Sequence, residues 1–412
     1  MARKLRFEAR TATEAILRYL YGGFLAFLLL TLWLALRPGA WDGGGLAAYA
    51  LLHLDVLGWV TTVMLGVYLN LLPVTLPGAR VKPSWASLFF WPYALGMVSL
   101  ILGFASGSSP LLAGAGVLLP VALLALGLHL LWGVFPVRSE MLRRPTALSY
   151  LLAPLSLAAA GVLGGLMALA LAGLLPPTFL GIVRFHLLLA LGGWLGLTVM
   201  GSAYRLVPFF FAVPSPRDEP LWGSLAVLLW GGGLLLAGMG WRWGLLFLIL
   251  GALLFFVDMA RMMAAGQHRK LEPVLLLTAI SLGLFLGAAL LAGVASTQES
   301  PWPWLRGALY IALYLAPSLL IFAQLSRILV FLTTLDLLQR KGIRTDRRWN
   351  LSRPRLTFWG AGLFLPGGLA VALGALLPEW AAVGGGWLQL AGGLLLMGSL
   401  FPALWARRLL RD

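Results

Sequence analysis

Long apolar runs alternate with short polar or Gly- and Pro-rich segments along the whole chain. Each run holds about 20 residues, the length at which a helix crosses the roughly 30 Å of hydrocarbon in a bilayer. The pattern predicts an all-α, polytopic membrane protein with about twelve transmembrane helices, built as a single transmembrane domain over residues 1–412. The predicted spans are approximately 16–37, 46–73, 85–105, 110–136, 148–174, 180–208, 221–240, 243–264, 273–295, 304–335, 356–377 and 382–406.

The basic residues are divided unequally between the two sets of loops. With both termini placed in the cytoplasm, 25 of the 30 lysines and arginines fall on inside segments and 4 on outside segments. This is the positive-inside bias, so the net charge of +16 is first a topology signal. Nucleic-acid binding is not expected, because the charge is spread over seven cytoplasmic segments. Richness in Leu, Ala, Gly and Arg indicates a GC-rich genome, and we predict a multi-pass protein of a bacterial cytoplasmic (inner) membrane, in contact with its lipid bilayer.

Composition narrows the chemistry that the chain can carry. The sequence is 60% hydrophobic and 11% charged, with a mean hydropathy of +0.92. It has no cysteine, which excludes disulfides, thiolate-bound iron–sulfur clusters, haem attached through Cys-x-x-Cys-His and thiolate catalysis. It also has no phosphate-binding glycine loop, zinc motif or catalytic triad, and no chain of carboxylates that would indicate a dedicated proton pump.

Two of the predicted spans resemble each other. A shift of 135 residues relates the spans near 46–73 and 180–208, which run in the same direction. They are therefore a candidate internal repeat of the parallel kind, not the inverted kind common in transporters. Chance or shared packing chemistry is the alternative. The shift superposes Gly58 on Gly193, Trp59 on Trp194, Gly66 on Gly201, Leu71 on Leu206 and Pro73 on Pro208.

A histidine opens each of these two stretches. His53 and His186 lie about seven residues into their spans, roughly 10 Å below the outer surface. An imidazole inside a membrane is costly unless it is bonded or ligates something. Two imidazoles at one depth can ligate a haem iron from opposite faces. The histidines lie two positions out of register under the repeat, so they would have to converge from different helix faces.

We therefore predict a b-type haem near the outer face, with copper not expected. His53 and His186 are the metal ligands, and the shared pairs Gly58-Trp59 and Gly193-Trp194 belong to the cofactor-binding set. The glycines would leave room for a flat ring or for a close helix. The alternative is that both histidines are separate packing residues bonded to carbonyl or hydroxyl groups.

The other two histidines differ in setting. His129, in the fourth span, is a candidate ligand for a second haem or a copper ion, although a lone membrane histidine is more often a bonded packing residue. His268 falls in a predicted cytoplasmic loop. Asp55 lies two residues after His53 and points away from it, toward a neighbouring helix or a polar group of a ligand.

The residues around the second span resemble the catalytic subunit of the haem–copper oxidases. The resemblance rests on His53 and Gly66, then the segments 70–73, 79–83 and 88–91, which read Asn-Leu-Leu-Pro, Ala-Arg-Val-Lys-Pro and Leu-Phe-Phe-Trp. His186, Gly192, Tyr204 and Pro208 resemble another histidine-headed span of that family. The layout is also similar to that of NnrS-type membrane haem proteins, which are linked to nitric oxide stress.

This resemblance implies a haem ligand at His53 and twelve spans with both ends inside, but the chain departs from the oxidase pattern. It has four histidines where the oxidases need six, none of them in the tenth span, and no His-His or His-x-His. A haem–copper oxygen-reducing centre is therefore not expected. The predicted function is respiratory electron transfer or nitric oxide handling, with quinol or respiratory-complex subunits as partners. A twelve-span transporter and a cofactor-free assembly or structural subunit are the alternatives.

Overall fold

The computed structural model describes residues 2–37, 39, 45–140, 143–213, 221–266, 273–341, 351 and 353–408. Within these ranges every assigned element is a helix, so the all-α prediction is confirmed for this part of the chain. The elements are α1 (Ala2–Leu36), α2 (Gly45–His53), η2 (Leu54–Thr61), α3 (Thr62–Thr75), α4 (Pro83–Ser106), α5 (Ser109–Val134), η3 (Phe135–Glu140), α6 (Pro145–Leu171), η4 (Pro177–Ile182), α7 (Val183–Leu187), η5 (Leu188–Gly196), α8 (Leu197–Phe210), α9 (Leu221–Gly238), α10 (Trp243–Ala264), α11 (Pro273–Ala295), α12 (Trp302–Tyr310), η6 (Ile311–Leu315), α13 (Ala316–Lys341), α14 (Pro354–Ala372), η7 (Gly374–Leu376) and α15 (Glu379–Arg408).

Ten helices in the described part of the chain are long and apolar enough to cross a membrane, which confirms a polytopic membrane protein. The two other predicted spans correspond to α9, with a shorter apolar stretch at Trp222–Gly238, and to the 19-residue α14. The total of twelve spans and the cytoplasmic termini stay predictions. The ten helices are Ala15–Leu36, Gly45–Leu69, Pro83–Ser106, Ser109–Ser139, Pro145–Leu171, Pro177–Phe210, Trp243–Ala264, Val274–Ala295, Trp302–Thr334 and Glu379–Ala406.

The chain divides into two compact units. The first contains Met1–Thr13, Leu20–Val63 and Leu271–Asp412, and the second contains Glu14–Tyr19 and Met64–Lys270. Boundaries between the units therefore fall inside α3 and, on both sides of Glu14–Tyr19, inside α1. That residues 1–412 form a single transmembrane domain stays a prediction.

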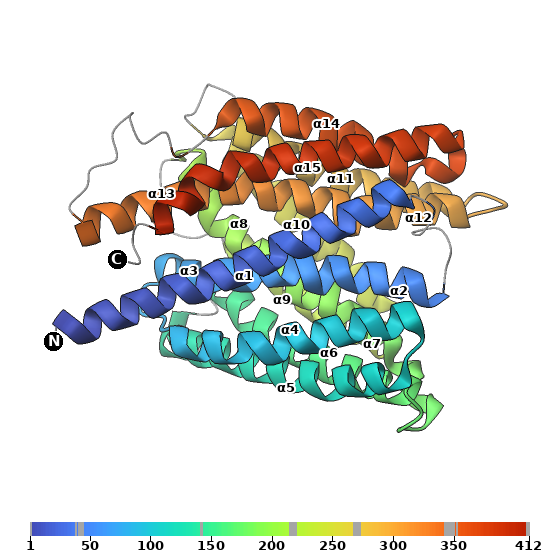
Figure 1. The fold of residues 1–412 in the computed structure, drawn as a ribbon, viewed down its shortest axis with the longest axis horizontal. Helices are drawn as coiled ribbons and strands as arrows, with labels where there is room; N and C mark the ends of the chain where they lie inside the picture. The colour runs from blue at the N-terminus through green and yellow to red at the C-terminus, as the bar shows by residue number, and fades with distance from the viewer. Residues whose placement is uncertain are drawn as a thin grey trace. The chain divides into compact units, whose positions relative to one another are not determined.

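In the first unit, α14 and α15 lie side by side (Figure 1). Small residues bring their backbones together: a Cβ at Gly360 would lie 2.9 Å from the carbonyl oxygen of Gly392, and one at Gly367 would lie 2.6 Å from that of Gly385. Close approach through glycine is a usual way for helices to pack in lipid, where no hydrophobic force draws them together. α11 packs against α12 and α13 in the same unit.

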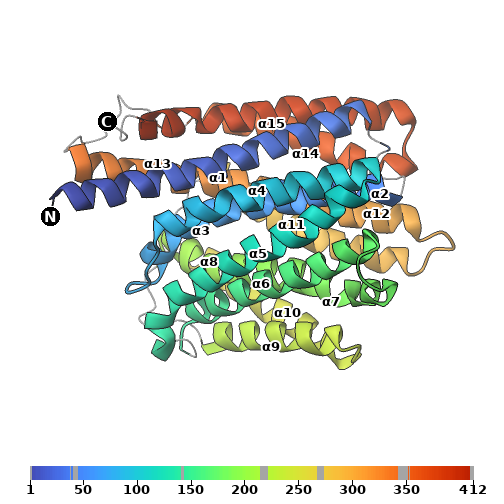
Figure 2. The same cartoon turned by 60° about the horizontal axis from the view of Figure 1, so that its bottom comes forward.

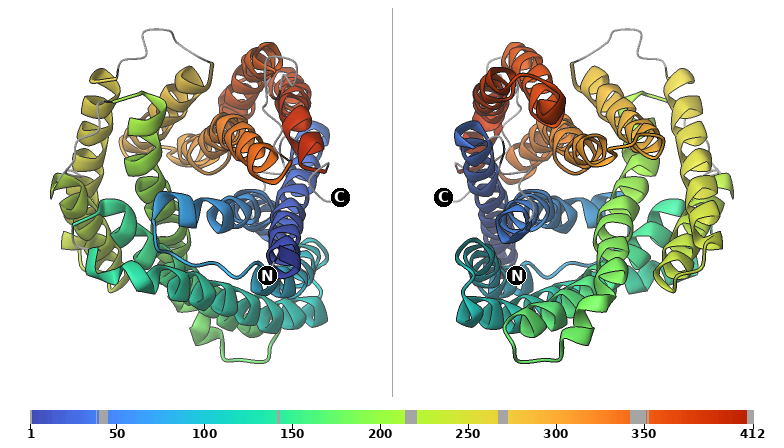
Figure 3. Two further views of the ribbon diagram at one scale, coloured as in Figure 1. Left: turned by 90° about the vertical axis from the view of Figure 1, so that its left-hand side faces the viewer. Right: turned by 90° about the vertical axis from the view of Figure 1, so that its right-hand side faces the viewer.

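In the second unit, α5 packs against both α4 and α6 (Figure 2). The contact between α5 and α6 uses glycine on both sides, since a Cβ at Gly116 would lie 3.1 Å from the carbonyl oxygen of Gly165. α9 and α10 form another close pair (Figure 3). There a Cβ at Gly251 would lie 2.8 Å from the backbone nitrogen of Trp230. The glycine-rich sequence thus serves helix packing in both units.

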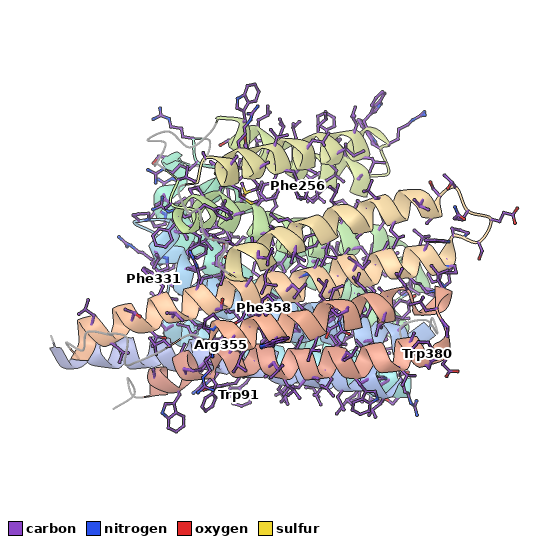
Figure 4. The ribbon with its side chains drawn as sticks, turned by 90° about the horizontal axis from the view of Figure 1, so that it is seen from above. Trp91, Phe256, Phe331, Arg355, Phe358 and Trp380 are labelled. Carbon is purple, nitrogen blue, oxygen red and sulfur yellow. The ribbon has the colours of Figure 1, made fainter. Side chains whose placement is uncertain are left out.

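Many large apolar side chains project away from the helices. Figure 4 labels Trp91 of α4, Phe358 of α14 and Trp380 of α15, which are 58%, 55% and 76% exposed. Tryptophan and phenylalanine at such exposure would be unfavourable in water and are expected where a helix faces lipid. This surface agrees with the membrane location predicted from hydropathy.

Candidate functional site

Three long helices are interrupted by π-helical segments. The first is η2, between α2 and α3; the second is η5, between α7 and α8; the third is η6, between α12 and α13. A π segment widens the helix and shifts the register of the side chains that follow, and such segments occur frequently at functional sites. Each therefore marks a place where regular helical packing has been given up.

Two of these interruptions fall at matching places in the candidate repeat. The 135-residue shift takes Leu54–Thr61 onto positions 189–196, and η5 occupies Leu188–Gly196. Trp59 and Trp194 each lie two residues before the end of their π segment, and both side chains are buried. The two stretches thus share a local structure as well as a sequence pattern, and common ancestry stays a hypothesis.

His53 is the last residue of α2, immediately before η2. Its Nδ1 lies 2.8 Å from the carbonyl oxygen of Tyr49, one turn earlier, and its side chain is partly exposed. In the tautomer that donates this bond, Nδ1 carries the proton and Nε2 carries the lone pair. That is the form in which a histidine ligates a metal.

His186 lies in α7, two residues before η5. Its Nδ1 lies 3.0 Å from the carbonyl oxygen of Ala160 on α6, so this ring is held by a neighbouring helix. Gly164, one turn further along α6, lies beside the ring: a Cβ there would lie 2.8 Å from Cε1 of His186. The missing side chain lets the imidazole lie against α6, again with Nε2 as the nitrogen that carries the lone pair.

The two predicted haem ligands therefore share a bonding pattern but lie in different units, His53 in the first and His186 in the second. Each ring has Nδ1 against a carbonyl, the arrangement found behind most metal-bound histidines. The same arrangement is also expected if the two histidines are separate packing residues bonded to carbonyl groups. That both rings bind one iron stays a prediction.

Trp59 lies in an aromatic cluster of the first unit. Its indole Nε1 donates to the hydroxyl of Ser318 at 2.9 Å, and its ring lies 4.8 Å from that of Phe27 and 5.3 Å from that of Phe322. The adjacent Gly58 is also buried. Protein side chains thus account for the contacts of this indole, and its place in a cofactor site stays a prediction.

Trp194 lies in the second unit, with its ring 5.9 Å from that of Tyr68. Tyr68 in turn packs 4.7 Å from Tyr150 and donates its hydroxyl to the carbonyl of that residue. A Cβ at Gly193 would collide with the side chain of Ser156 on α6, so this glycine permits close helix packing. Here too, cofactor binding stays a prediction beside an evident structural role.

His129 on α5 is enclosed by other groups. Its Nε2 accepts from the backbone N–H of Lys82 at 3.3 Å, and its ring stacks between Trp85 and Trp132 at 5.9 and 6.2 Å. An Nε2 that accepts a hydrogen bond has its lone pair engaged. This arrangement favours a packing role for His129 over a role as a metal ligand. Metal ligation by His129 stays a prediction.

No group of three or more His, Asp or Glu side chains that could hold a metal ion occurs in the described ranges. The fourth histidine, His268, lies outside the described residues. A haem needs fewer protein ligands than such a cluster supplies, because the porphyrin provides four nitrogens itself.

Sequence reasoning missed a second polar site in the first unit. The carboxylate of Asp55 is fully buried, and neither oxygen has a hydrogen-bond partner among the described groups. The hydroxyls of Tyr310 and Tyr314 are close enough to interact electrostatically with this carboxylate. Tyr310 donates to the side-chain carbonyl of Gln389 at 2.6 Å. The signal in the sequence was the pair of tyrosines four residues apart, one turn of an apolar helix.

Comparison with known proteins gives no family for the chain. No model of a known protein family matches it, and no curated protein matches it in sequence. The likeness to the haem–copper oxidases and the NnrS-type proteins accordingly remains a resemblance of motifs around His53 and His186.

Proposed function

We propose that this polytopic membrane protein binds a b-type haem in the predicted outer half of the membrane, with His53 and His186 as nitrogen ligands. The observation that carries the proposal is common to both rings. Each Nδ1 lies against a backbone carbonyl, at 2.8 Å for His53 and 3.0 Å for His186. This bond orients a metal-binding imidazole and raises the basicity of its other nitrogen.

The position of the histidines supports the same proposal. His53 directly precedes η2, and His186 lies two residues before η5. A π segment is less stable than regular α-helix and is retained mainly where it serves a function. Each of these two segments lies beside a histidine whose Nδ1 is bonded to a carbonyl, in stretches that already resemble each other. This favours a shared role for the two histidines.

The number of protein ligands would decide the use of the haem. When bound, a b-type haem supplies one-electron redox chemistry. With both His53 and His186 as its ligands, the haem would serve electron transfer with quinol or a respiratory-complex subunit. With one histidine as its ligand, it would bind a diatomic molecule and serve nitric oxide handling.

The first test is a visible absorption spectrum of the purified protein, oxidised and then reduced with dithionite. We expect a Soret band and about one haem per chain by pyridine haemochrome, since the two predicted ligands serve one iron. His53→Gly and His186→Gly should each lose most of the band. Adding imidazole should restore part of it, because free imidazole can replace a deleted ligand.

His129→Ala is the matched control. Its ring is bonded to the backbone of Lys82, so this variant should keep the Soret band of the unaltered protein. A colourless protein after expression with ample haem would sink the haem proposal. A band that survives both glycine variants but disappears in His129→Ala would move the ligand role to His129.

A transporter is the second candidate function, and the buried polar centre at Asp55 is the observation that favours it. Substrate and coupling-ion sites of secondary transporters lie near the middle of the bilayer and use polar groups buried among helices. This candidate predicts a colourless protein whose substrate uptake by proteoliposomes requires Asp55. For an assembly subunit we find no specific supporting observation.

A further inference from the structure

Four polar side chains meet inside the first unit, in a setting that has no aqueous exposure. Asp55, Tyr310 and Tyr314 are 0% exposed and Gln389 is 1% exposed. They come from three long helices, with Asp55 in η2, Tyr310 at the end of α12, Tyr314 in the following η6, and Gln389 in α15. A carboxylate in such a place is costly unless its charge is compensated.

Most polar atoms of this set have no hydrogen-bond partner among the described residues. In the described part of the chain, hydrogen-bond partners are absent for both carboxylate oxygens of Asp55, the hydroxyl of Tyr314 and the side-chain nitrogen of Gln389. The exceptions are the hydroxyl of Tyr310 and the side-chain oxygen of Gln389, because the first donates to the second. Buried polar atoms are almost always satisfied, so four unsatisfied atoms in one place call for a functional explanation.

Asp55, Tyr314 and Gln389 lie at similar distances from the starts of their helices. Asp55 lies ten residues after the start of α2, Gln389 lies ten after the start of α15, and Tyr314 lies twelve after the start of α12. At about 1.5 Å per residue these positions are roughly 15 to 18 Å along their helices. That is about half of the 30 Å hydrocarbon layer, which places the polar set near the middle of the membrane.

Irregular backbone positions the side chains of Asp55 and Tyr314. Asp55 lies in η2 and Tyr314 lies in η6, and these two π segments are in contact. On α14, Gly368 leaves space for the third group, because a Cβ there would lie 2.7 Å from Nε2 of Gln389. The fold thus departs from regular helix where the polar groups gather, as is frequent at binding sites.

We propose that Asp55, Tyr314 and Gln389 form a membrane-buried binding site for one small monovalent cation, a proton or Na⁺. One positive charge neutralises one carboxylate, and full burial excludes a large organic cation. A single carboxylate is a poor site for a divalent ion, which prefers several charged oxygens. The site is independent of haem, since none of its groups is a predicted haem ligand.

A proton would satisfy all four orphaned atoms, and a sodium ion would satisfy the three oxygens among them. A proton on Asp55 makes one oxygen a donor and leaves the other an acceptor, matching a hydroxyl that can do both and an amide that donates. A sodium ion would take the carboxylate and hydroxyl oxygens as ligands, as hard cations do. The surrounding ionisable groups are Tyr310 and Tyr314, which face Asp55, with His53 on α2 and Arg306 on α12 nearby in sequence.

Infrared difference spectroscopy of the protein in lipid tests the proposal. The spectrum of Asp55→Asn is subtracted from that of the unaltered protein at pH 7, first in choline chloride and then in NaCl. We expect a protonated carboxyl C=O band assigned to Asp55 in choline chloride. Its persistence in NaCl identifies a proton site, and its replacement by ionised carboxylate bands identifies a sodium site.

Two further variants keep the result interpretable. Asp258→Asn removes the other aspartate that is buried in the described part of the chain and serves as the matched control, since it should leave the Asp55 signal in place. Tyr314→Phe keeps the carboxyl and should shift the frequency of its band, which also serves if Asp55→Asn fails to fold. Ionised Asp55 bands in choline chloride that NaCl leaves unchanged would overturn the proposal, as would a band that Tyr314→Phe does not shift.

Discussion

Two buried aspartates in membrane-spanning helices are treated differently by their surroundings. Asp258 on α10, in the second unit, accepts from the hydroxyl of Tyr204 at 3.1 Å and lies near the cation of Arg261, three residues later. Asp55 in η2, in the first unit, has no hydrogen-bond partner among the described groups. Both are at most 5% exposed.

The difference separates a structural carboxylate from one that is held for a ligand. Asp258 sits in regular α-helix, with its tyrosine partner also packed against Phe255 of the same helix at 5.7 Å. Asp55 sits in a π segment, opposite another π segment. Burial alone therefore does not identify a site; unmet bonding capacity combined with irregular backbone does.

The largest difference in the free energy of unfolding should appear when each of the two carboxylates is removed. Asp258→Ala should lower the free energy of unfolding by about 1.5 to 3 kcal/mol, because it deletes a charge-assisted hydrogen bond and strands the hydroxyl of Tyr204. Asp55→Ala, the matched variant, should change it by less than about 1 kcal/mol, because no hydrogen bond to a described group is lost. Denaturation in mixed detergent micelles measures both. Equal losses would remove the distinction between the two aspartates.

A smaller effect is expected within the polar centre itself, from two tyrosines on one helix. Tyr310→Phe removes a donor bonded to Gln389 at 2.6 Å and should cost about 1 kcal/mol of unfolding free energy. Tyr314→Phe removes a hydroxyl that has no hydrogen-bond partner among the described groups, so it should cost less than Tyr310→Phe. The same unfolding measurement decides. A larger loss for Tyr314→Phe than for Tyr310→Phe would mean that the hydroxyl of Tyr314 makes the stronger bond, and the order of the two tyrosines would be reversed.

The smallest effect concerns the attachment of η2 to α13. Ser318→Ala removes the acceptor for Nε1 of Trp59 and should cost about 0.6 kcal/mol, the average for hydrogen bonds between membrane helices. Ser326→Ala on the same helix is the control, since its hydroxyl bonds only to Ala323 one turn earlier. Equal stability of the two variants would show that the bond to Trp59 does not hold the π segment in place.

Much of the fold follows from the sequence because the bilayer imposes a simple length rule. Predicted spans such as 16–37 and 243–264 reappear as the membrane-length helices Ala15–Leu36 and Trp243–Ala264. A backbone in hydrocarbon must satisfy its own hydrogen bonds, so an apolar run of sufficient length forms a helix almost regardless of its details. The 135-residue shift that superposes Trp59 on Trp194 also has a structural counterpart, because both residues lie near the ends of π segments.

The contacts of the candidate site could be predicted from the sequence only in part. His53 and His186 could be found as rare ionisable residues in apolar runs, but their bonds to the carbonyls of Tyr49 and Ala160 could not. The same holds for His129, whose ring lies between two tryptophans, one of them 44 residues earlier in sequence. Hydropathy assigns a residue to a helix and not to a helix face, and it does not specify which helices are neighbours.

The sequence by itself determined that this is an all-helical membrane protein, where along the chain most of its long apolar helices lie, and which few polar residues lie inside the apolar runs. Those properties depend on local composition and on the thickness of the bilayer. Only the tertiary structure decided which of those residues are satisfied. Tyr310 finds Gln389 79 residues away, Asp258 finds Tyr204 54 residues away, and Asp55 finds no described partner. Hydrogen bonding is short-ranged and directional, so it depends on packing between helices that the order of residues along the chain does not record.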